Sequence, residues 1–301
     1  MNPPARRSVL LFFIDGIGVG LDDPAVNPLA SDDRPVLRLT RGASPRSSSA
    51  GAPAFAAGID ASLGVPGLPQ SATGQTAILT GVNAPAALGR HVSGFPGPTL
   101  QRILREHSLL KTLTEAGRHA TFLNAFGPRF FDAAEPRRRL SATTLATLAS
   151  GTPFRDWADL TAGRAVAHDL THWRMRDYGF DLAARTPEEA GAIIARETMK
   201  CDFALFEYFE TDRAGHARDR SAAVRCLSDL SAALEAVLAG VDLRDTVVLV
   251  ASDHGNLEDE RVKTHTLNPA FFAAWGALDG LTPPESLTGI APLVLRATSV
   301  A

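Results

Sequence analysis

Residues 8–18, SVLLFFIDGIG, decide the architecture of this chain. The run from Ser8 to Ile14 is almost entirely apolar, and Asp15 and Gly16 end it. A short, continuous apolar run that stops at an Asp-Gly pair is typical of a strand buried on both faces of a parallel sheet. We therefore expect a central parallel strand at residues 8–14, with the carboxylate of Asp15 directly after its carboxyl end.

Similar apolar runs recur along the chain and alternate with helical patterns. Strands are also predicted at residues 58–63, 120–125, 202–208 and 246–251, and helices at 73–82, 99–117, 186–200, 221–238 and 286–296. The helix at 186 has the clearest start, since Thr186 suits its N-cap, Pro187 its first turn and Glu189 a capping box. Strands that alternate with helices predict an α/β fold, with a doubly wound, mainly parallel sheet and helices on both faces.

The length of the chain, 301 residues, suits a single domain over residues 1–301. Residues 22–51 are rich in Asp, Pro, Ser and Gly, which predicts a long surface loop. Residues 128–180 follow no regular pattern, and we expect them to form a small lid or insertion.

Composition argues against several classes of protein. A net charge of -3 gives no indication of a nucleic-acid or anionic-membrane partner. The apolar run that Asp15 ends is too short for a signal peptide, and no stretch approaches the roughly 20 apolar residues that span a bilayer. The two cysteines, Cys201 and Cys226, are too few for a disulfide framework and lack a metal-type spacing, so we expect two small buried side chains. These features predict a soluble, cytoplasmic protein.

Three predicted strands lead into side chains that bind metal ions. The segments are FFIDGIG, FETDRAGH and LVASDHGN, and their side chains, with one histidine further along, are Asp15, Asp212, His216, Asp253, His254 and His265. Alone, an Asp after a strand is often a helix N-cap, and a lone histidine is more often a satisfied structural residue. Ligands of open α/β sheets bind at the carboxyl ends of the strands, so we expect this set to converge there.

The ligand types indicate the chemistry of the predicted site. Carboxylates and imidazoles suit Zn²⁺ or Mn²⁺, and no thiolate is in place. Two divalent ions bring four positive charges. Three Asp carboxylates and one serine alkoxide would cancel these four charges. A phosphate group would then meet two Lewis acids, which is the arrangement of two-metal in-line displacement.

A candidate nucleophile lies in residues 67–81, GLPQSATGQTAILTG. A hydroxyl at a helix N-terminus is well placed to handle an anion, because free N–H groups and the helix dipole face it. The same hydroxyl can simply be an N-cap, and Ser71, Thr73 and Thr76 are all candidates for that role.

At these residues the chain resembles the metalloenzyme branch of the alkaline phosphatase superfamily, which includes cofactor-independent phosphoglycerate mutase and phosphopentomutase. The shared motifs follow the family order: D-G-x-G at 15–18, a nucleophile segment, D-x-x-x-H at 212–216, D-H-G-N at 253–256 and H-T-L-N-P at 265–269. The resemblance covers about residues 8–82 and 186–300. It implies an alkaline-phosphatase-like fold.

The resemblance also implies roles for individual residues. The nucleophile aligns with Ser71, three residues before Gly74, and Thr76 is the second candidate; the mutases have a histidine where this chain has Gln75. One metal, Mn²⁺ or Zn²⁺, would be held by Asp212, His216 and His265. The other would be held by Asp15, Ser71, Asp253 and His254.

One departure from the family bears on the reaction. Both mutases carry a large cap between the nucleophile and the D-x-x-x-H motif, whereas the interval from Ser71 to Asp212 is much shorter here. Less exclusion of water favours hydrolysis over transfer back to a substrate. We therefore expect a phosphatase or phosphodiesterase that forms a phosphoserine intermediate on a small phosphorylated substrate.

Other substrate contacts and two other functions stay open. Arg137, Arg138 and Arg139 are candidates for substrate binding, although a basic run is often only solvated, and Asn124 is a further candidate. The first alternative function is an intramolecular phosphomutase that acts on a phosphorylated sugar or acid. The second is a non-catalytic metal-binding scaffold.

Overall fold

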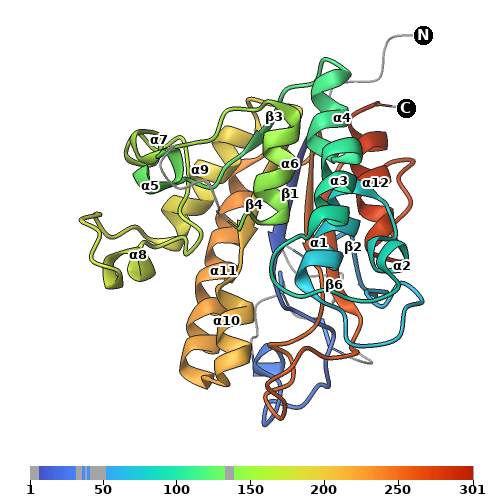
Figure 1. Cartoon of the computed structure of the whole chain (residues 1–301). Helices are drawn as coiled ribbons and strands as arrows, with labels where there is room; N and C mark the ends of the chain where they lie inside the picture. The colour runs from blue at the N-terminus through green and yellow to red at the C-terminus, as the bar shows by residue number, and fades with distance from the viewer. Residues whose placement is uncertain (1–6, 32–35, 38, 41–51, 133–138, 301) are drawn as a thin grey trace.

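The structure is a computed structural model that describes residues 7–31, 36–37, 39–40, 52–132 and 139–300. Within these ranges the chain forms a six-stranded sheet in the order β2-β6-β5-β1-β4-β3 (Figure 1). The strands are β1 (Ser8–Ile14), β2 (Phe55–Ile59), β3 (Ala120–Phe122), β4 (Phe203–Tyr208), β5 (Thr246–Ser252) and β6 (Ala270–Gly276). Strand β6 runs antiparallel to β5 and β2, and the pairs among β5, β1, β4 and β3 are parallel. The predicted fold class is confirmed.

Strand β1 occupies the centre of the sheet because both of its faces are apolar. Leu10 and Phe12 point into one buried cluster, and Leu11 and Phe13 point into the cluster on the opposite face. This alternation follows from the two-residue period of a strand. Phe12 also meets Phe206 of β4 edge to face, with ring centroids 4.9 Å apart.

Helices cover both faces of the sheet, as predicted (Figure 1). On one face lie α9 (Pro187–Thr198) and α11 (Arg220–Gly240). On the other lie α1 (Ser71–Thr80), α3 (Pro98–His107), α4 (Leu109–Glu115), α6 (Ala142–Ser150) and α12 (Ile290–Ala297). The shorter helices are η1 (Pro28–Ser31), α2 (Ala84–Leu88), α5 (Pro128–Phe131), α7 (Trp157–Thr161), α8 (Trp173–Asp177), α10 (Glu210–Ala217) and η2 (Leu287–Gly289).

The observed elements differ from the predicted ones in several places. The strand expected at 58–63 is β2 at 55–59, and the strand expected at 120–125 ends at Phe122. The helix expected at 99–117 is two helices, because Ser108 adopts an extended conformation and caps α4 by accepting a hydrogen bond from the N–H of Lys111. Strand β6 was not predicted at all. It joins the sheet by pairing Val250 of β5 with Ala273 and Gly58 of β2 with Phe271.

The remaining predictions concern cysteines, membranes and the long loop. Cys201 and Cys226 are buried and free, and burial raises the pKa of their thiols to about 12 and about 11. Every helix among the described residues is too short or too polar to cross a bilayer. Within the loop predicted at 22–51, residues 32–35, 38 and 41–51 lie outside the described part of the chain.

Candidate metal centre

The sequence-predicted ligands meet at the carboxyl edge of the sheet. Asp15 directly follows β1, and Asp253 and His254 directly follow β5. Helix α10 begins two residues after β4 and carries Asp212 and His216 one turn apart. The sheet therefore brings together side chains that lie far apart in the sequence.

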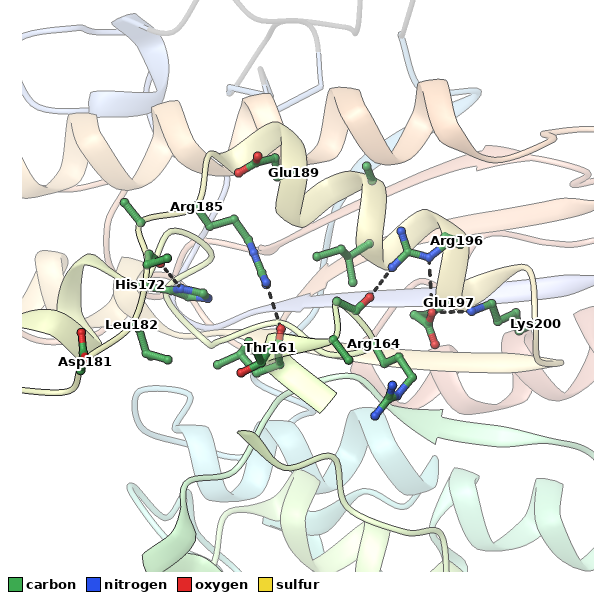
Figure 2. Close-up of a pocket in the computed structure, with 17 residues that line it drawn as sticks. Thr161, Arg164, His172, Asp181, Leu182, Arg185, Glu189, Arg196, Glu197 and Lys200 are labelled. Atoms are coloured by element: carbon green, nitrogen blue, oxygen red, sulfur yellow. Dashed lines mark hydrogen bonds and ion pairs between the residues drawn. The ribbon is translucent and has the colours of Figure 1, made fainter. Parts of the chain in front are cut away.

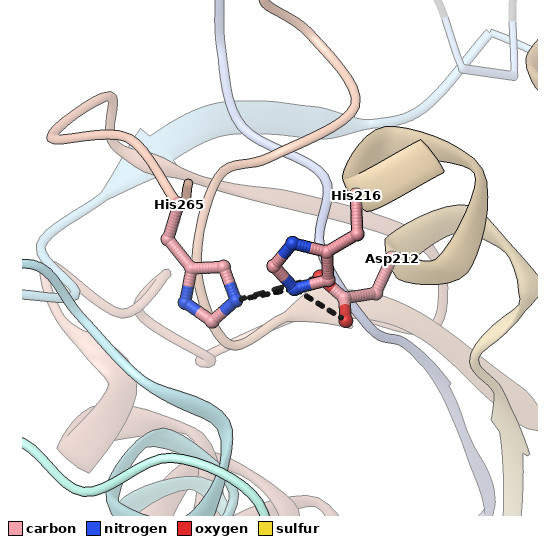
Figure 3. A group of neighbouring side chains, drawn as sticks. All are labelled: Asp212, His216 and His265. Atoms are coloured by element: carbon pink, nitrogen blue, oxygen red, sulfur yellow. Dashed lines mark hydrogen bonds and ion pairs between the residues drawn. The ribbon is translucent and has the colours of Figure 1, made fainter. Parts of the chain in front are cut away.

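One group of ligands consists of Asp212, His216 and His265 (Figure 3). The Nε2 atoms of the two histidines are 3.2 Å apart, and carboxylate oxygens of Asp212 lie 3.3 Å from His216 Nε2 and 3.6 Å from His265 Nε2. The Nδ1 atoms are 2.8 Å from the carbonyl oxygens of Lys263 and Pro69. Because a carbonyl only accepts, each Nδ1 carries the proton, and both Nε2 lone pairs face the same point beside a carboxylate. That arrangement suits a cation.

A second group consists of Asp15, Asp212 and His254, with Asp253 and Ser71 beside it. His254 Nε2 lies 3.2 Å from Asp15 Oδ1 and 3.5 Å from Asp253 Oδ2. It also lies 3.0 Å from the Oγ of Ser71. Asp212 belongs to both groups, so the two candidate sites are neighbours that share a carboxylate.

The charges of this cluster are not balanced by the protein alone. Burial and the charge of Asp15 raise the pKa of Asp253 well above its usual range, and the same two causes raise that of Asp212. Burial opposes ionisation of His254, but Asp253 and Asp15 outweigh it and raise the pKa of that imidazole to about 10. The oxygens Asp15 Oδ1 and Asp253 Oδ2 are buried without a hydrogen bond among the described residues. Divalent cations would satisfy these atoms and relieve the crowding of carboxylates, so the residues fit such ions.

The hydroxyl of Ser71 is the one that faces this cluster. Ser71 is the first residue of α1 and follows Gln70, which is extended. Thr76, the second candidate nucleophile, is fully buried and donates its hydroxyl proton to the carbonyl oxygen of Ala72 at 2.6 Å. Thr73 likewise donates to the carbonyl of Gln70. The geometry therefore favours Ser71 among the three.

A close approach of backbones holds Ser71 near the ligands. A Cβ atom added to Gly74 would lie 2.9 Å from the carbonyl oxygen of Asp253. Gly16 has a φ of +77°, and an added Cβ there would lie 2.8 Å from the Cβ of Asp212. Glycine at these two positions lets α1 and the end of β1 pack directly against the ligand-bearing segments.

Sequence reasoning missed several side chains that hold the ligands. Gln75 donates to Asp15 Oδ2 at 3.1 Å, and Asn256 donates to Asp212 Oδ1 at 2.6 Å. Glu258 is buried and accepts from the N–H groups of Gly18 and Asn256 at 2.8 and 2.7 Å. A sequence signal existed for Asn256, the last residue of the D-H-G-N motif, and for Gln75, which stands where the mutases have a histidine, whereas nothing in the local pattern distinguished Glu258.

We expect Asn256→Ala to weaken metal binding by about 10- to 100-fold, because groups that orient a metal ligand typically contribute that much affinity. The variant removes the hydrogen bond of 2.6 Å that Asn256 Nδ2 donates to Asp212 Oδ1. Titration of the metal-stripped protein with Mn²⁺ or Zn²⁺ in a calorimeter measures the change. Asn83→Ala, which removes the N-cap of α2, serves as the matched control. Equal affinities in both variants would show that Asn256 has no such role.

A cavity of about 510 Å³ opens beside the metal centre. Ser71, Asp15 and Asp212 are among the residues that line it. Glu207, at the carboxyl end of β4, also lines it; burial raises the pKa of its carboxyl to about 7, although a hydrogen bond from Thr143 opposes the shift. The candidate nucleophile therefore faces a space that can hold a substrate.

A second polar feature of this cavity is His168. Its Nε2 lies 3.4 Å from Glu210 Oε1, and its ring stacks on that of Phe209 with centroids 4.4 Å apart. Glu210 is buried and also accepts from Arg174 at 2.5 and 2.9 Å. The carboxylate of Glu210 thus lies close behind the imidazole, although neither His168 Nε2 nor Glu210 Oε1 has a hydrogen bond among the described residues. His168 lies in segment 128–180, in which no sequence motif pointed to it.

The predicted substrate contacts fall in different places. Asn124 lines the cavity, but its amide donates to the carbonyl of Glu207 at 2.7 Å and accepts from the N–H of Glu207 at 2.9 Å, so both polar atoms are already used. Arg139 is exposed and does not line this cavity. Arg137 and Arg138 lie outside the described residues.

A larger cavity, of about 860 Å³, lies between α7 and α9 (Figure 2). Its basic side chains already have partners: Lys200 Nζ is 2.7 Å from Glu197 Oε1, and Arg185 Nη2 is 3.0 Å from the carbonyl oxygen of Leu160. None of the predicted ligands lines it. Size alone therefore does not identify the functional cavity of this protein.

Comparison with known proteins agrees with this geometry. Residues 176–297 match the sequence model of the Metalloenzyme superfamily. The 2,3-bisphosphoglycerate-independent phosphoglycerate mutase of Desulforudis audaxviator is 34% identical over 123 residues, which make up 38% of this chain and 24% of that protein. The match thus spans about a quarter of the length of the curated relatives.

Two solved structures show the same fold over nearly the whole chain. The alkaline phosphatase of the Antarctic bacterium TAB5 has a TM-score of 0.53 at 16% identity, covering 99% of both chains. The phosphoglycerate mutase of Leishmania mexicana has a TM-score of 0.53 at 11% identity, covering 99% of this chain and 96% of the other. The resemblance noted from the motifs agrees with these findings: residues 176–297 match the Metalloenzyme superfamily model, and the fold of the chain is alkaline-phosphatase-like.

Proposed function

We propose that this protein is a metal-dependent phosphate-ester hydrolase in which Ser71 is the nucleophile. The observation that supports this most is the position of the Ser71 hydroxyl. It lies 3.0 Å from His254 Nε2, at the start of α1 and in the lining of a cavity of about 510 Å³. A hydroxyl, a group of metal-type ligands and space for a substrate meet at this point.

In this proposal the ligands divide between two cations. Asp212, His216 and His265 would hold one ion, and Asp15, Ser71, Asp253 and His254 would hold the other. Mn²⁺ or Zn²⁺ at these positions would supply positive charge that favours ionisation of the serine hydroxyl and offsets negative charge on the phosphate oxygens. The donor set, oxygen and nitrogen without sulfur, suits both ions equally.

The residues of the chain account for the rest of the reaction. Ser71 Oγ loses its proton and forms a bond to phosphorus, while the bond from phosphorus to the ester oxygen breaks and the alcohol leaves with a proton. The phosphate is then carried by the serine at the N-terminus of a ten-residue helix, whose dipole favours an anion there. Water attacks the phosphoserine, which releases phosphate and restores the serine hydroxyl.

Hydrolysis is favoured over transfer by the short interval between Ser71 and Asp212, which leaves room for only a small cover over the site. Residues 141–175 supply part of that cover, since Ser141, Thr144, His168 and Met175 line the cavity. The curated relatives that match are named as mutases, which favours an intramolecular phosphomutase as the second candidate.

The test uses the protein loaded with Mn²⁺ or with Zn²⁺ and supplied with p-nitrophenyl phosphate and a panel of phosphomonoesters. We expect metal-dependent release of inorganic phosphate. Phosphorus NMR measures this release. A phosphorylated product that forms with little free phosphate would favour the mutase. Bound metal without turnover on any ester would contradict both catalytic proposals and leave the metal-binding scaffold.

A further inference from the structure

Five large apolar side chains line the cavity next to Ser71. They come from four separate segments: Phe95 precedes α3, Phe122 and Phe126 lie at and after the end of β3, Met175 is in α8, and Phe209 precedes α10. Phe126 is held in place by neighbouring rings, with centroids 4.9 Å from Phe154 and 4.2 Å from Phe130. Segments that are distant in the sequence thus build one apolar wall.

The polar groups among these described residues are mostly engaged. His168 turns Nε2 toward Glu210 at 3.4 Å, and Asn124 bonds to the backbone of Glu207. Glu207 accepts from the hydroxyl of Thr143 at 2.6 Å. Arg213, whose side chain is 45% exposed, is 2.9 Å from the hydroxyl of Tyr178. The interior of the cavity therefore presents apolar surface and a carboxyl group to whatever follows the phosphate.

Phe95 differs from the other apolar residues of the wall because the protein leaves much of it exposed. Its side chain lies in the cavity wall, yet 49% of the residue is exposed. An exposed phenylalanine at the mouth of a largely apolar cavity gains burial only when something apolar enters. Sites that bind small molecules typically combine such apolar walls with a few polar groups that fix orientation.

We propose that the substrate is a phosphate monoester whose alcohol part has an apolar, preferably aromatic, body that packs against Phe95, Phe126 and Phe209. This inference rests on the proposed function and names its substrate class. The phosphate lies beside Ser71 and Asp212, and the body of the alcohol extends along the apolar wall. A substrate with a carboxylate in that position would face Glu207 and the apolar wall, and the guanidinium of Arg213, which also lines the cavity, already donates to the hydroxyl of Tyr178.

The experiment compares two esters of primary alcohols, 2-phenylethyl phosphate and glycerol 1-phosphate, with the metal-loaded protein. Burying a phenyl group should raise kcat/KM for the first ester by about 10- to 100-fold over the second, from the usual strength of apolar burial. Phe95→Ala should reduce this ratio by about three- to tenfold, since it removes part of the wall. Met175→Ala provides a second variant from a different segment. Met199→Ala, which truncates an exposed side chain at the end of α9, should leave the ratio unchanged.

The outcomes separate this inference from the function on which it rests. Failure to release phosphate from either ester and from p-nitrophenyl phosphate overturns the hydrolase proposal and this inference together. Hydrolysis of both esters with equal kcat/KM, or a preference for glycerol 1-phosphate, overturns the substrate class alone. A ratio that persists in folded Phe95→Ala and Met175→Ala proteins also overturns it, whereas a loss in both that Met199→Ala does not share supports it.

Discussion

Replacing Ser71 with alanine is expected to lower kcat for phosphate-ester hydrolysis by about three to six orders of magnitude, the usual cost of losing a catalytic nucleophile. The reason is that Ser71 has the only hydroxyl of α1 placed against the ligand cluster, 3.0 Å from His254. The variant removes one oxygen and leaves the cavity and the ligands of the other cation in place. Steady-state phosphate release in the presence of Mn²⁺ or Zn²⁺ measures the loss.

The matched control is Thr76→Ala on the same helix. Its buried hydroxyl donates to the carbonyl of Ala72 in the same helix, so we expect this variant to keep kcat within a few-fold of the original protein. Trapping the intermediate with acid and locating the phosphate by mass spectrometry gives an independent check, with Ser71 as the modified residue. Phosphate on Thr76, or full activity in Ser71→Ala, would exclude the assignment of the nucleophile.

Removing the metals is expected to lower both the rate of hydrolysis and the stability of the folded protein. A cation that binds only the folded protein stabilises it by about 4 kcal/mol when its free concentration is 1,000 times the dissociation constant. On each of the buried carboxylates of Asp15 and Asp253, one oxygen has no hydrogen bond within the described part of the chain, which makes this site unfavourable when it is empty. We therefore expect chelation to abolish turnover and lower the melting temperature by several degrees, and Mn²⁺ or Zn²⁺ to restore both.

Asp212→Asn is the sharpest variant for this effect, because Asp212 belongs to both groups of ligands. It should remove most of the thermal shift on metal addition and lower the number of ions bound per chain, measured by elemental analysis after dialysis. Asp242→Asn, at an exposed position that pairs with Arg244, is the control and should keep the full shift. Two ions bound with an unchanged thermal shift in Asp212→Asn would contradict the shared role of this carboxylate.

The fold was predictable from the sequence where local patterns and the sheet agree. The run at 8–14 is apolar on both faces because β1 is central, and the capping box at Thr186 places the start of α9 within one residue. Strand β6 escaped prediction because its pairing with β5 and β2 is decided by tertiary contacts. The break between α3 and α4 at Ser108 was not predicted because the leucine spacing continues across it. A capping serine does not interrupt such a pattern.

Part of the candidate site was likewise predictable from the sequence, and part was not. The carboxylate and imidazole side chains that the motifs predicted do lie together at the carboxyl edge of the sheet, and the assignment of metals to them stays a prediction. The walls of the cavity were not predictable, since Phe95, His168 and Met175 come from irregular segments without a common pattern. Glu207 was not predicted for another reason. A single glutamate within a predicted strand is usually read as a side chain that faces water, and the sequence alone does not show that this one lines a cavity.

The central position of β1 has a consequence for how the protein is made. Its register pairs Val9 with Phe203 of β4 and with Val247 of β5, so neither neighbour exists when β1 leaves the ribosome. At about 5–20 residues per second, synthesis of the intervening chain takes on the order of 10 to 40 s. During that interval the segment VLLFFI is an apolar strand with two unpaired edges, the kind of sequence that associates with other nascent chains. The demand that this fold makes on cellular chaperones thus begins with the very strand that later positions Asp15.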